Sequence, residues 1–449
     1  MNEEKSLDVF RNAPVGTAIL KNALPAILAM LMVLVYNLAD TFFIGQTHNA
    51  LLVAAVSVAT PVFLIFMAIG TIFGVGGTSV ISRAMGEGRY DYAKKVSSFC
   101  MWVSVALGVL LAAVMFIFAD PILRLVGASD DTIGYASTYL KIVVLCGPFL
   151  LVSNCYSNVI RAEGQSGKAM VGQILGNVLN IVLDPIMILG FKWNIAGAAV
   201  ATVIGNAFSA VYYLVYLLNG KSMLSIRLKD FTVREGVCKS VFAIGIPAAL
   251  GSVLMSISQI ITNNQMAEYG DMPIAAMGVA MKVFMIASII TMGLGQGIQP
   301  LLGYCIGAKL WGRYKKILRY SIISATVLSA IMTCLCYLFT NQIAGAFLNN
   351  PEAFGYAVTF ARILLSTTIL VSALFVLTNA LQAMGAATQA LIINIGRQGF
   401  IFIPAVFILK AIFGMNGVIW AQPLADLVSL FFTVFMYSNA FKNIVRKDI

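Results

Sequence analysis

The chain has 449 residues, of which 60% are hydrophobic and only 10% charged, and its formal net charge is +11. Soluble proteins of average composition carry about 25% charged residues. These values exclude an ordinary soluble protein and indicate an all-α integral membrane protein.

Twelve apolar runs are long enough to cross a bilayer, which takes roughly 20 residues of helix. The first follows acidic as well as basic residues and is too long for a signal-peptide core, so we expect it to be a true span. In chain order, the predicted spans are 16–45, 51–82, 96–118, 136–162, 167–190, 195–219, 240–267, 273–307, 317–340, 357–384, 388–411 and 416–440.

The positive charge is distributed by side of the membrane. If the N-terminus lies inside, 22 of the 29 Lys and Arg residues fall on the inner side and five on the outer side, and Lys282 and Arg397 lie within spans. This asymmetry follows the positive-inside rule. We therefore expect both termini to be cytoplasmic, and no nucleic-acid partner.

The sequence contains an internal duplication. Shifting residues 54–96 by 221 positions onto 275–317 keeps 13 identities in 43 positions, including glycines and a Lys-Lys pair in a loop. An even number of spans per half gives two parallel repeats. We expect an N-terminal six-helix lobe over 1–219, a cytoplasmic linker over 220–239 and a C-terminal six-helix lobe over 240–449, an arrangement typical of alternating-access transporters.

Only three acidic residues lie within spans, namely Asp40, Asp184 and Asp426. A charge at the bilayer centre costs about 2.5–3.5 kcal/mol even on the lenient insertion scale, so such residues suggest function. Asp40, Asp184 and Thr202 all lie about 10 Å below the outer ends of their helices. Asn180 precedes Asp184 by one turn on the same helix face.

Other polar residues extend this set. Asn177 continues the stripe of Asn180 and Asp184, and Asn206 repeats the step after Thr202. Pro185 frees the carbonyl of Ile181, which is tolerated where it faces a cavity. Two carboxylates, an amide, a hydroxyl and a carbonyl form an oxygen set suited to a hard cation, and neighbouring carboxylates can also exchange a proton. The alternative is that each Asp is a paired structural acid.

The sequence resembles the multidrug and toxic compound extrusion (MATE) family over essentially its whole length. The similarity rests on Pro25, NLADTFFIG (37–45), RAEGQSGKA (161–169), NVLNIVLDP (177–185) and IAGAAVAT (195–202). The resemblance implies a V-shaped pair of six-helix bundles in a bacterial-type cytoplasmic membrane. It also implies export of cationic amphipathic compounds by antiport with Na+ or H+.

In the DinF-like branch of that family, the coupling ion is bound by residues that match Asp40, Asn180, Asp184 and Thr202, all present here. The proline matching Pro25 is associated with bending of the first helix. The NorM-like branch places carboxylates in the C-terminal lobe, whereas Gln259 and neighbouring amides occupy helix 7 here. We therefore expect no C-lobe coupling site, and assign the chain to the DinF-like or a neighbouring branch.

Several residues keep two interpretations. Lys282, Arg397 and Asp426 form either a structural ion pair or a fixed countercharge for coupling or for an anionic substrate group. Tyr139, Asn154 and Asn158 either line a substrate cleft or bridge helices. We expect no cofactor beyond Na+ or H+, no enzymatic activity and function as a monomer. The main rival is a lipid-linked precursor flippase of the same superfamily, for which Lys282 and Arg397 are the two hints.

Overall fold

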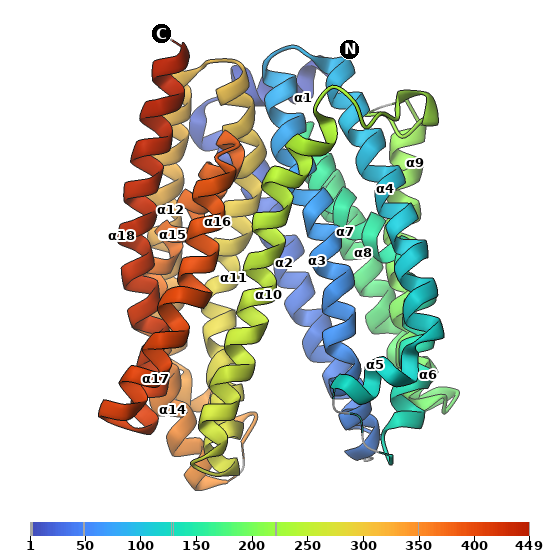
Figure 1. The fold of residues 1–449 in the computed structure, drawn as a ribbon, viewed down its shortest axis with the longest axis vertical. Helices are drawn as coiled ribbons and strands as arrows, with labels where there is room; N and C mark the ends of the chain where they lie inside the picture. Colours follow the sequence, from blue (N-terminus) through green and yellow to red (C-terminus); the bar gives the residue numbers. More distant parts are fainter. Residues whose placement is uncertain are drawn as a thin grey trace. The chain divides into compact units, whose positions relative to one another are not determined.

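The computed structural model describes residues 3–47, 50–126, 128, 130–220, 222–348 and 350–448, and every regular element within them is a helix (Figure 1). The elements before the linker are α1 (Glu3–Arg11), α2 (Val15–Gly45), α3 (Ala50–Gly86), α4 (Tyr90–Ile117), α5 (Ala119–Val126), α6 (Ile133–Leu145), α7 (Gly147–Ala162), α8 (Ser166–Pro185), the π-helical turn η1 (Ile186–Gly190) and α9 (Asn194–Leu218).

A short 3₁₀ turn, η2 (Leu228–Asp230), lies between the halves. The elements of the second half are α10 (Val237–Ala267), α11 (Asp271–Gly307), α12 (Trp311–Leu338), α13 (Thr340–Gly345), α14 (Pro351–Leu365), α15 (Thr368–Met384), α16 (Ala387–Ile395), the π-helical turn η3 (Gly396–Ile401), α17 (Phe402–Phe413) and α18 (Met415–Asp448).

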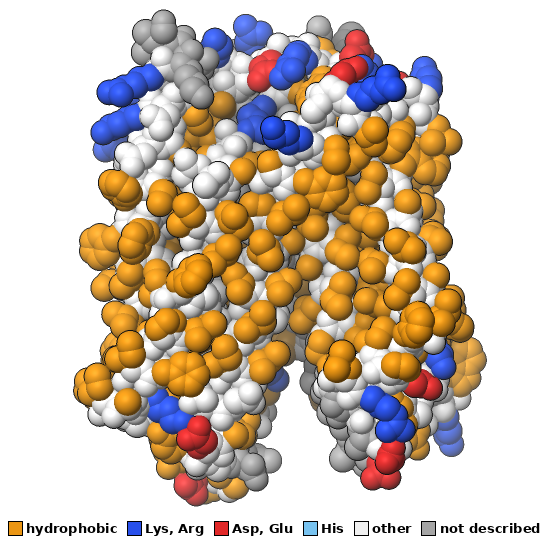
Figure 2. Space-filling view, viewed as in Figure 1, with side chains coloured by type: hydrophobic (Ala, Val, Ile, Leu, Met, Phe, Trp, Pro, Cys, Tyr) orange, Lys and Arg blue, Asp and Glu red, His pale blue; other side chains and the backbone are white. Residues whose placement is uncertain are grey.

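The helices confirm a polytopic membrane protein. Among the described residues, ten helices are long and apolar enough to cross a membrane, or twelve if each of two bent pairs counts as one span. On the face drawn in Figure 2, apolar side chains cover the middle of the helices, and Lys, Arg, Asp and Glu gather at their ends. Each of the twelve predicted spans corresponds to one of these helices or helix pairs.

Two predicted single helices are in fact broken. The span predicted over 136–162 consists of α6 and α7, bent by 58°, and that over 357–384 consists of α14 and α15, bent by 48°. In the first, Pro148 lies at the start of α7, and a proline lacks the N–H that would continue the helix and disfavours helical backbone before it. The second break has no proline and falls at Ser366 and Thr367.

The repeat extends to details that the sequence did not predict. The short helix α5 begins at residue 119 and its counterpart α13 at residue 340, an offset of 221. Both halves carry one bent helix pair and one π-helical turn. The duplication therefore preserved irregular backbone as well as long spans.

The internal contacts of the chain define two compact units. Unit 1 is Met1–Ala13 with Leu28–Gly245, and unit 2 is Pro14–Ile27 with Ile246–Ile449. The division predicted at 220–239 follows the sequence repeat, whereas the packing divides within α2 and α10. Thus α2 and α10 each contribute to both units.

Close contacts at two glycines explain why the boundaries between the units fall within α2 and α10. Gly76 of α3 lies so close to the Val241 carbonyl of α10 that no Cβ fits between them. Gly297 of α11, which the repeat aligns with Gly76, would place a Cβ 2.6 Å from the Cα of Ala23 in α2. Small residues let helix backbones approach closely in membranes. Each unit therefore includes the first few turns of the other half's first helix.

Hydrogen bonds also hold the linker to unit 1. The buried Glu163 carboxylate accepts from the Tyr216 hydroxyl at 2.7 Å, the Ser222 hydroxyl at 2.8 Å and the Met223 N–H at 2.9 Å. The Trp102 indole donates to the Ile226 carbonyl at 3.0 Å. The segment between the halves is thus part of the first unit.

Candidate functional site

The predicted acidic constellation comes together inside unit 1. Asp40 lies on α2, Asn180 and Asp184 on α8, and Thr202 on α9. The Asn180 amide donates to the Thr202 hydroxyl at 3.3 Å, and Asp184 lies close enough to Asp40 for the two carboxyls to interact. Three helices that are distant in sequence therefore contribute to one polar cluster.

Close packing of α8 on α9 aligns Asn180 with Thr202. A Cβ on Gly205 would lie 2.7 Å from the Gly176 carbonyl oxygen and 3.1 Å from the Asn180 Cβ. Gly176 in turn leaves no space for a side chain against Ser209. With two glycines facing each other, the helix backbones approach closely enough for a short amide and a threonine hydroxyl to meet.

The end of α8 is irregular next to Asp184. Pro185 ends the helix, and the chain continues as the π-helical turn η1. A Cβ on Gly197 of α9 would lie 2.8 Å from the Met187 carbonyl oxygen, so α9 also approaches this turn closely. π-helical turns often occur at functional sites, and this one follows the buried carboxylate directly.

Four oxygen atoms of this cluster lack hydrogen-bond partners among the described residues. Asp184 is 0% exposed, yet among the described residues neither of its carboxylate oxygens has a hydrogen-bond partner. The same holds for Asp40 Oδ1 and Asn180 Oδ1. Leaving an ionised carboxylate buried and unpaired is very costly. The cluster therefore fits a guest that supplies positive charge, either a proton or a hard cation bound by oxygen.

Two tyrosines complete the cluster. Tyr139 of α6, predicted as a cleft candidate, is buried near Asp40 and Asp184. Tyr36 of α2 was not predicted; its hydroxyl bonds to the Thr202 side chain, and it also lies near both carboxyls. The signal was present in the sequence, because Tyr36 precedes Asp40 by four residues and so shares its helix face.

The remaining N-terminal candidates have different surroundings. The Asn206 amide donates to the Thr202 backbone carbonyl, one turn earlier on α9, at 2.9 Å. Asn177 is partly buried, and its amide nitrogen has no partner among the described residues. Pro25 lies within α2 but belongs to unit 2, apart from the carboxylates.

Asn154 and Asn158 contact a neighbouring helix. Their side chains pack where Gly70 and Gly74 leave space on α3, and the Asn158 amide donates to the Asn154 carbonyl at 3.0 Å. The second half repeats this contact, since Asn379 packs against Gly295 at the same offset of 221. The repetition of the contact favours helix bridging for Asn158.

Two of the three intramembrane charges of the second half form an ion pair. Arg397 Nε donates to Asp426 Oδ1 at 2.8 Å, and the Gln422 amide donates to the same oxygen at 2.9 Å. Lys282 instead lies over the Phe347 ring, with its Nζ 4.5 Å from the ring centroid. This pairing favours the structural interpretation for Arg397 and Asp426.

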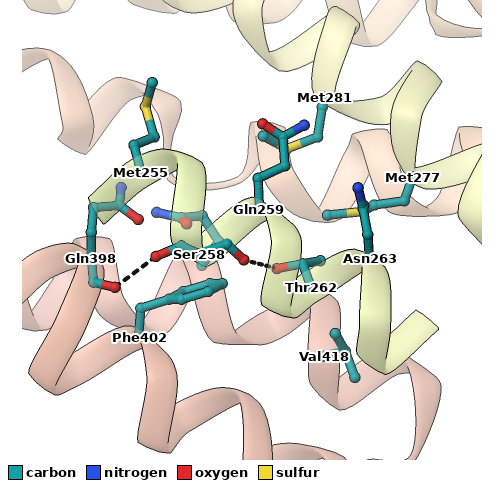
Figure 3. A pocket seen from close by; sticks show the side chains of 11 residues that line it. Met255, Ser258, Gln259, Thr262, Asn263, Met277, Met281, Gln398, Phe402 and Val418 are labelled. Atoms are coloured by element: carbon teal, nitrogen blue, oxygen red, sulfur yellow. Dashed lines mark hydrogen bonds between the residues drawn. The ribbon is translucent and has the colours of Figure 1, made fainter. Parts of the chain in front are cut away.

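A small cavity lies within unit 2 between α10, α11, η3, α17 and α18 (Figure 3). Its volume of about 30 Å³ has room for about two water molecules. Figure 3 shows the Ser258 hydroxyl donating to the Gln398 carbonyl, at 2.6 Å, beside Gln259 and Phe402. The described lining residues include no charged side chain, so the walls are uncharged and mostly apolar, with a few amide and hydroxyl groups among them.

Fold and site together define a class: a polytopic α-helical membrane protein built from two six-span repeats, with a pair of buried carboxyls in one unit. The MatE family model matches residues 25–186 and 247–408, two segments that are offset by 222 residues and follow the internal repeat. The chain belongs to the MATE family.

Individual relatives agree with this assignment. The chain is 32% identical over 424 residues to "Multidrug export protein MepA" of Staphylococcus aureus (strain MSSA476), covering 94% of each chain. It is 31% identical to the protein of the same name from Staphylococcus haemolyticus, covering 97% of this chain and 96% of the relative. It also shares the fold of a solved outward-facing MATE family transporter of the MOP superfamily, with a TM-score of 0.92, 23% identity and 98% of both chains covered.

Proposed function

We propose that this chain is a multidrug efflux antiporter that exports cationic amphipathic compounds in exchange for H+ or Na+. The family and the name multidrug export protein, carried by the relatives, support the export of varied small molecules. We place the protein in a bacterial cytoplasmic membrane with both termini inside, acting as a monomer. The excess of Lys and Arg on one side supports that orientation.

The observation that carries the coupling proposal is the set of unpaired buried oxygens on Asp40, Asn180 and Asp184. A buried carboxylate without a partner binds a proton or a cation strongly, because positive charge removes the cost of its burial. Asn180, Thr202 and Tyr36 orient the oxygens around that guest. The cluster would take up H+ or Na+ from one side of the membrane and release it on the other.

The course of α2 suggests how occupancy affects the rest of the protein. Asp40 lies in the part of α2 that belongs to unit 1, and Pro25 lies in the part that belongs to unit 2. Proline removes one backbone hydrogen bond from the helix interior and permits bending there. A guest shared by Asp40 and Asp184 fixes the outer part of α2 against α8, so its binding and release would change how α2 bends at Pro25.

Charge balance sets a minimum for the coupling ion. The membrane potential contributes about 2.3 kcal/mol per elementary charge per 100 mV. Export of a monovalent cation works against this potential, so at least one coupling cation should enter for each one exported. Two carboxylates in the cluster suffice for that exchange.

The pairing of Arg397 in unit 2 favours cation export over the flippase alternative. A lipid-linked pyrophosphate would need cationic side chains that are available to it, and Arg397 is already paired with Asp426. Lys282 lies over an aromatic ring. Export of cations needs neither residue as a countercharge.

Efflux from proteoliposomes tests the proposal. We would measure efflux of a fluorescent organic cation under an imposed Na+ gradient and, separately, under an imposed pH gradient. The proteins compared are wild type, Asp184→Asn and the control Asp91→Asn. The control changes a side chain that is exposed. We expect one gradient to drive efflux by wild type and by the control, and Asp184→Asn to give only the rate of empty vesicles. Equal gradient-driven efflux by Asp184→Asn would refute the assignment of this site.

A further inference from the structure

Exposed cations gather at the end of unit 2 where α12 begins and α18 ends. On the face drawn in Figure 2, Lys and Arg side chains lie at this end of α18, with no described Asp or Glu beside them. Among the described residues, none of the exposed cations of α12 and of this part of α18 forms a salt bridge. They are Lys315, Lys316, Arg319, Lys442 and Arg446, and we call them the basic cluster.

The acids of unit 2 lie elsewhere. Glu268, Asp271 and Glu352 lie at the opposite end, where α10 ends and where α11 and α14 begin. Asp426 is buried within α18. The sequence has one further acid, Asp448 in the last turn of α18, which is outside the side chains that the structure describes. The charged side chains described at this end of unit 2 are therefore all positive.

Unit 1 pairs the corresponding lysines with acids. The lysine pair of α12 has an aligned pair in α4, Lys94 and Lys95, at the offset of 221. Lys94 pairs with Asp91 at 3.3 Å, and Lys95 pairs with Glu235 at 2.7 Å. The same two positions of the repeat are thus neutralised within unit 1.

The second half lacks these acids. Gly312 stands at the position aligned with Asp91, and Glu235 belongs to the linker, which is not repeated. Lys315 instead lies over the Phe441 ring, with its Nζ 5.6 Å from the ring centroid. The excess of Lys and Arg on one side of the membrane accounts for cations at this end, but not for the loss of their acidic partners.

Aromatic side chains hold the two helices of the basic cluster together. Phe441 of α18 stacks on Tyr314 of α12, with ring centroids 5.6 Å apart, and meets the edge of Trp311 at 5.9 Å. Tyr437, one turn before Phe441, donates from its hydroxyl to the Tyr314 hydroxyl at 3.3 Å. The cations of both helices are therefore attached to one packed scaffold.

The basic cluster lies where both helices leave the apolar part of the membrane. The 34 residues of α18 form a helix about 51 Å long, whereas the hydrocarbon core is about 30 Å thick. Lys442 and Arg446 follow the apolar span of α18 within two turns. On α12, Trp311 and the 54% exposed Tyr320 flank the cations, and aromatic residues of this kind are enriched at the interface. The cations thus lie level with lipid headgroups.

We propose that the basic cluster binds the headgroups of anionic phospholipids in the leaflet on this side of the membrane. Lys and Arg donate charge-assisted hydrogen bonds to phosphate oxygens, and clusters of four or more cations beside a membrane helix attract anionic lipids. The orientation proposed above makes this the cytoplasmic leaflet. The inference is independent of ion coupling, because no residue of the carboxylate cluster contributes to it.

Lipid titration followed by native mass spectrometry tests this surface. The purified full chain would be titrated in a nonionic detergent with phosphatidylglycerol, which is anionic, or with phosphatidylcholine of the same acyl chains, which has no net charge. The test variant is Lys315→Gln with Lys316→Gln. The control is Lys94→Gln with Lys95→Gln, which removes the same net charge at the aligned positions, where both lysines are already paired.

We expect wild type to bind phosphatidylglycerol more tightly than phosphatidylcholine, with a preference that falls as salt is added. The test variant should lose about 5–25-fold in affinity for phosphatidylglycerol, since each cation near an anionic surface contributes about fivefold. The control should keep the wild-type affinity. A second variant on the other helix, Lys442→Gln with Arg446→Gln, should show a loss similar to that of the test variant.

Equal affinity of wild type for the two lipids would overturn the proposal. So would an equal loss in the test variant and in the control, because net charge alone would then explain the binding. Displacement of phosphatidylglycerol by millimolar inorganic phosphate would also contradict it, because the cluster would then be a site for free phosphate rather than for a lipid in the leaflet.

Discussion

The Asp184 side chain is fully buried, yet neither of its carboxylate oxygens has a hydrogen-bond partner among the described residues. Asp426 is equally buried in the other half, but one of its oxygens is bonded to Arg397 and Gln422. Both positions are intramembrane acids of duplicated halves. Because of this difference in their partners, we propose that Asp184 binds and releases a cation or proton and that Asp426 holds helices together.

The Tyr36 hydroxyl should influence ion binding because it bonds to Thr202 beside both carboxyls. Removing it by Tyr36→Phe should weaken the apparent affinity for the driving ion by about 2–10-fold, as expected for a net hydrogen bond of about 0.5–1.5 kcal/mol. The measurement is the dependence of efflux on ion concentration. Tyr135→Phe, at an exposed tyrosine of α6, is the matched control. An unchanged affinity in Tyr36→Phe would remove this tyrosine from the site.

The Arg397–Asp426 pair should contribute to stability rather than to transport. Asp426→Asn would leave the mostly buried Arg397 guanidinium without its countercharge and should destabilise the protein by about 3–5 kcal/mol. The double variant Arg397→Met with Asp426→Leu should recover most of that loss and retain transport. Unfolding in detergent and efflux in proteoliposomes measure the two effects. Loss of coupled transport in a stable double variant would show that the pair has a functional role.

Several helix–helix contacts depend on a glycine, because the backbone of the neighbouring helix occupies the position that a Cβ atom would take. Gly76→Ala and Gly297→Ala should each destabilise the protein by about 1–3 kcal/mol, because α3 and α11 would have to move away from α10 and α2. Gly278→Ala on α11 is the control, since nothing lies within 4 Å of its added Cβ. Thermal unfolding of the purified variants measures the effect. Equal stability of Gly297→Ala and Gly278→Ala would contradict this account of the contacts.

Span positions and the repeat could be predicted because they depend on local composition and spacing. Runs of apolar residues locate the helices, and the glycines shared at an offset of 221 locate the repeat. The breaks at Cys146 and at Ser366–Thr367 were missed, because a bent pair of helices has the same hydrophobicity as one straight helix. Pro148 was the available signal for the first break; the second has none.

The sequence predicted the residues of the candidate site but not every pairing among the intramembrane charges. The burial and alignment of Asp40, Asn180, Asp184 and Thr202 follow from depth and helical spacing, and the resemblance to the MATE family pointed to the same four residues. The pairing of Asp426 with Arg397 rather than Lys282 was not predictable, since it depends on how α18 packs against η3. Long-range packing of this kind leaves no periodic signal in the sequence.

The two units share α2, which connects the carboxylate cluster to the rest of the molecule. Asp40 and Pro25 are 15 residues apart on one helix, a distance of about 22 Å. Because residues 14–27 pack in unit 2 and residues from 28 onward in unit 1, a change at Asp40 acts on a helix that both units hold. In the coupling mechanism that we propose, this arrangement lets an ion bound at Asp40 act on both units.

Substrate-dependent release of the coupling ion tests the central claim most directly. If substrate and ion exclude each other, binding of an organic cation to the purified protein must release ions, by the reciprocity of linked binding. We predict that wild type releases H+ into a weakly buffered solution, or bound Na+, in proportion to the substrate bound. Asp40→Asn with Asp184→Asn should bind substrate and release neither ion. Equal release by wild type and this double variant would contradict the account.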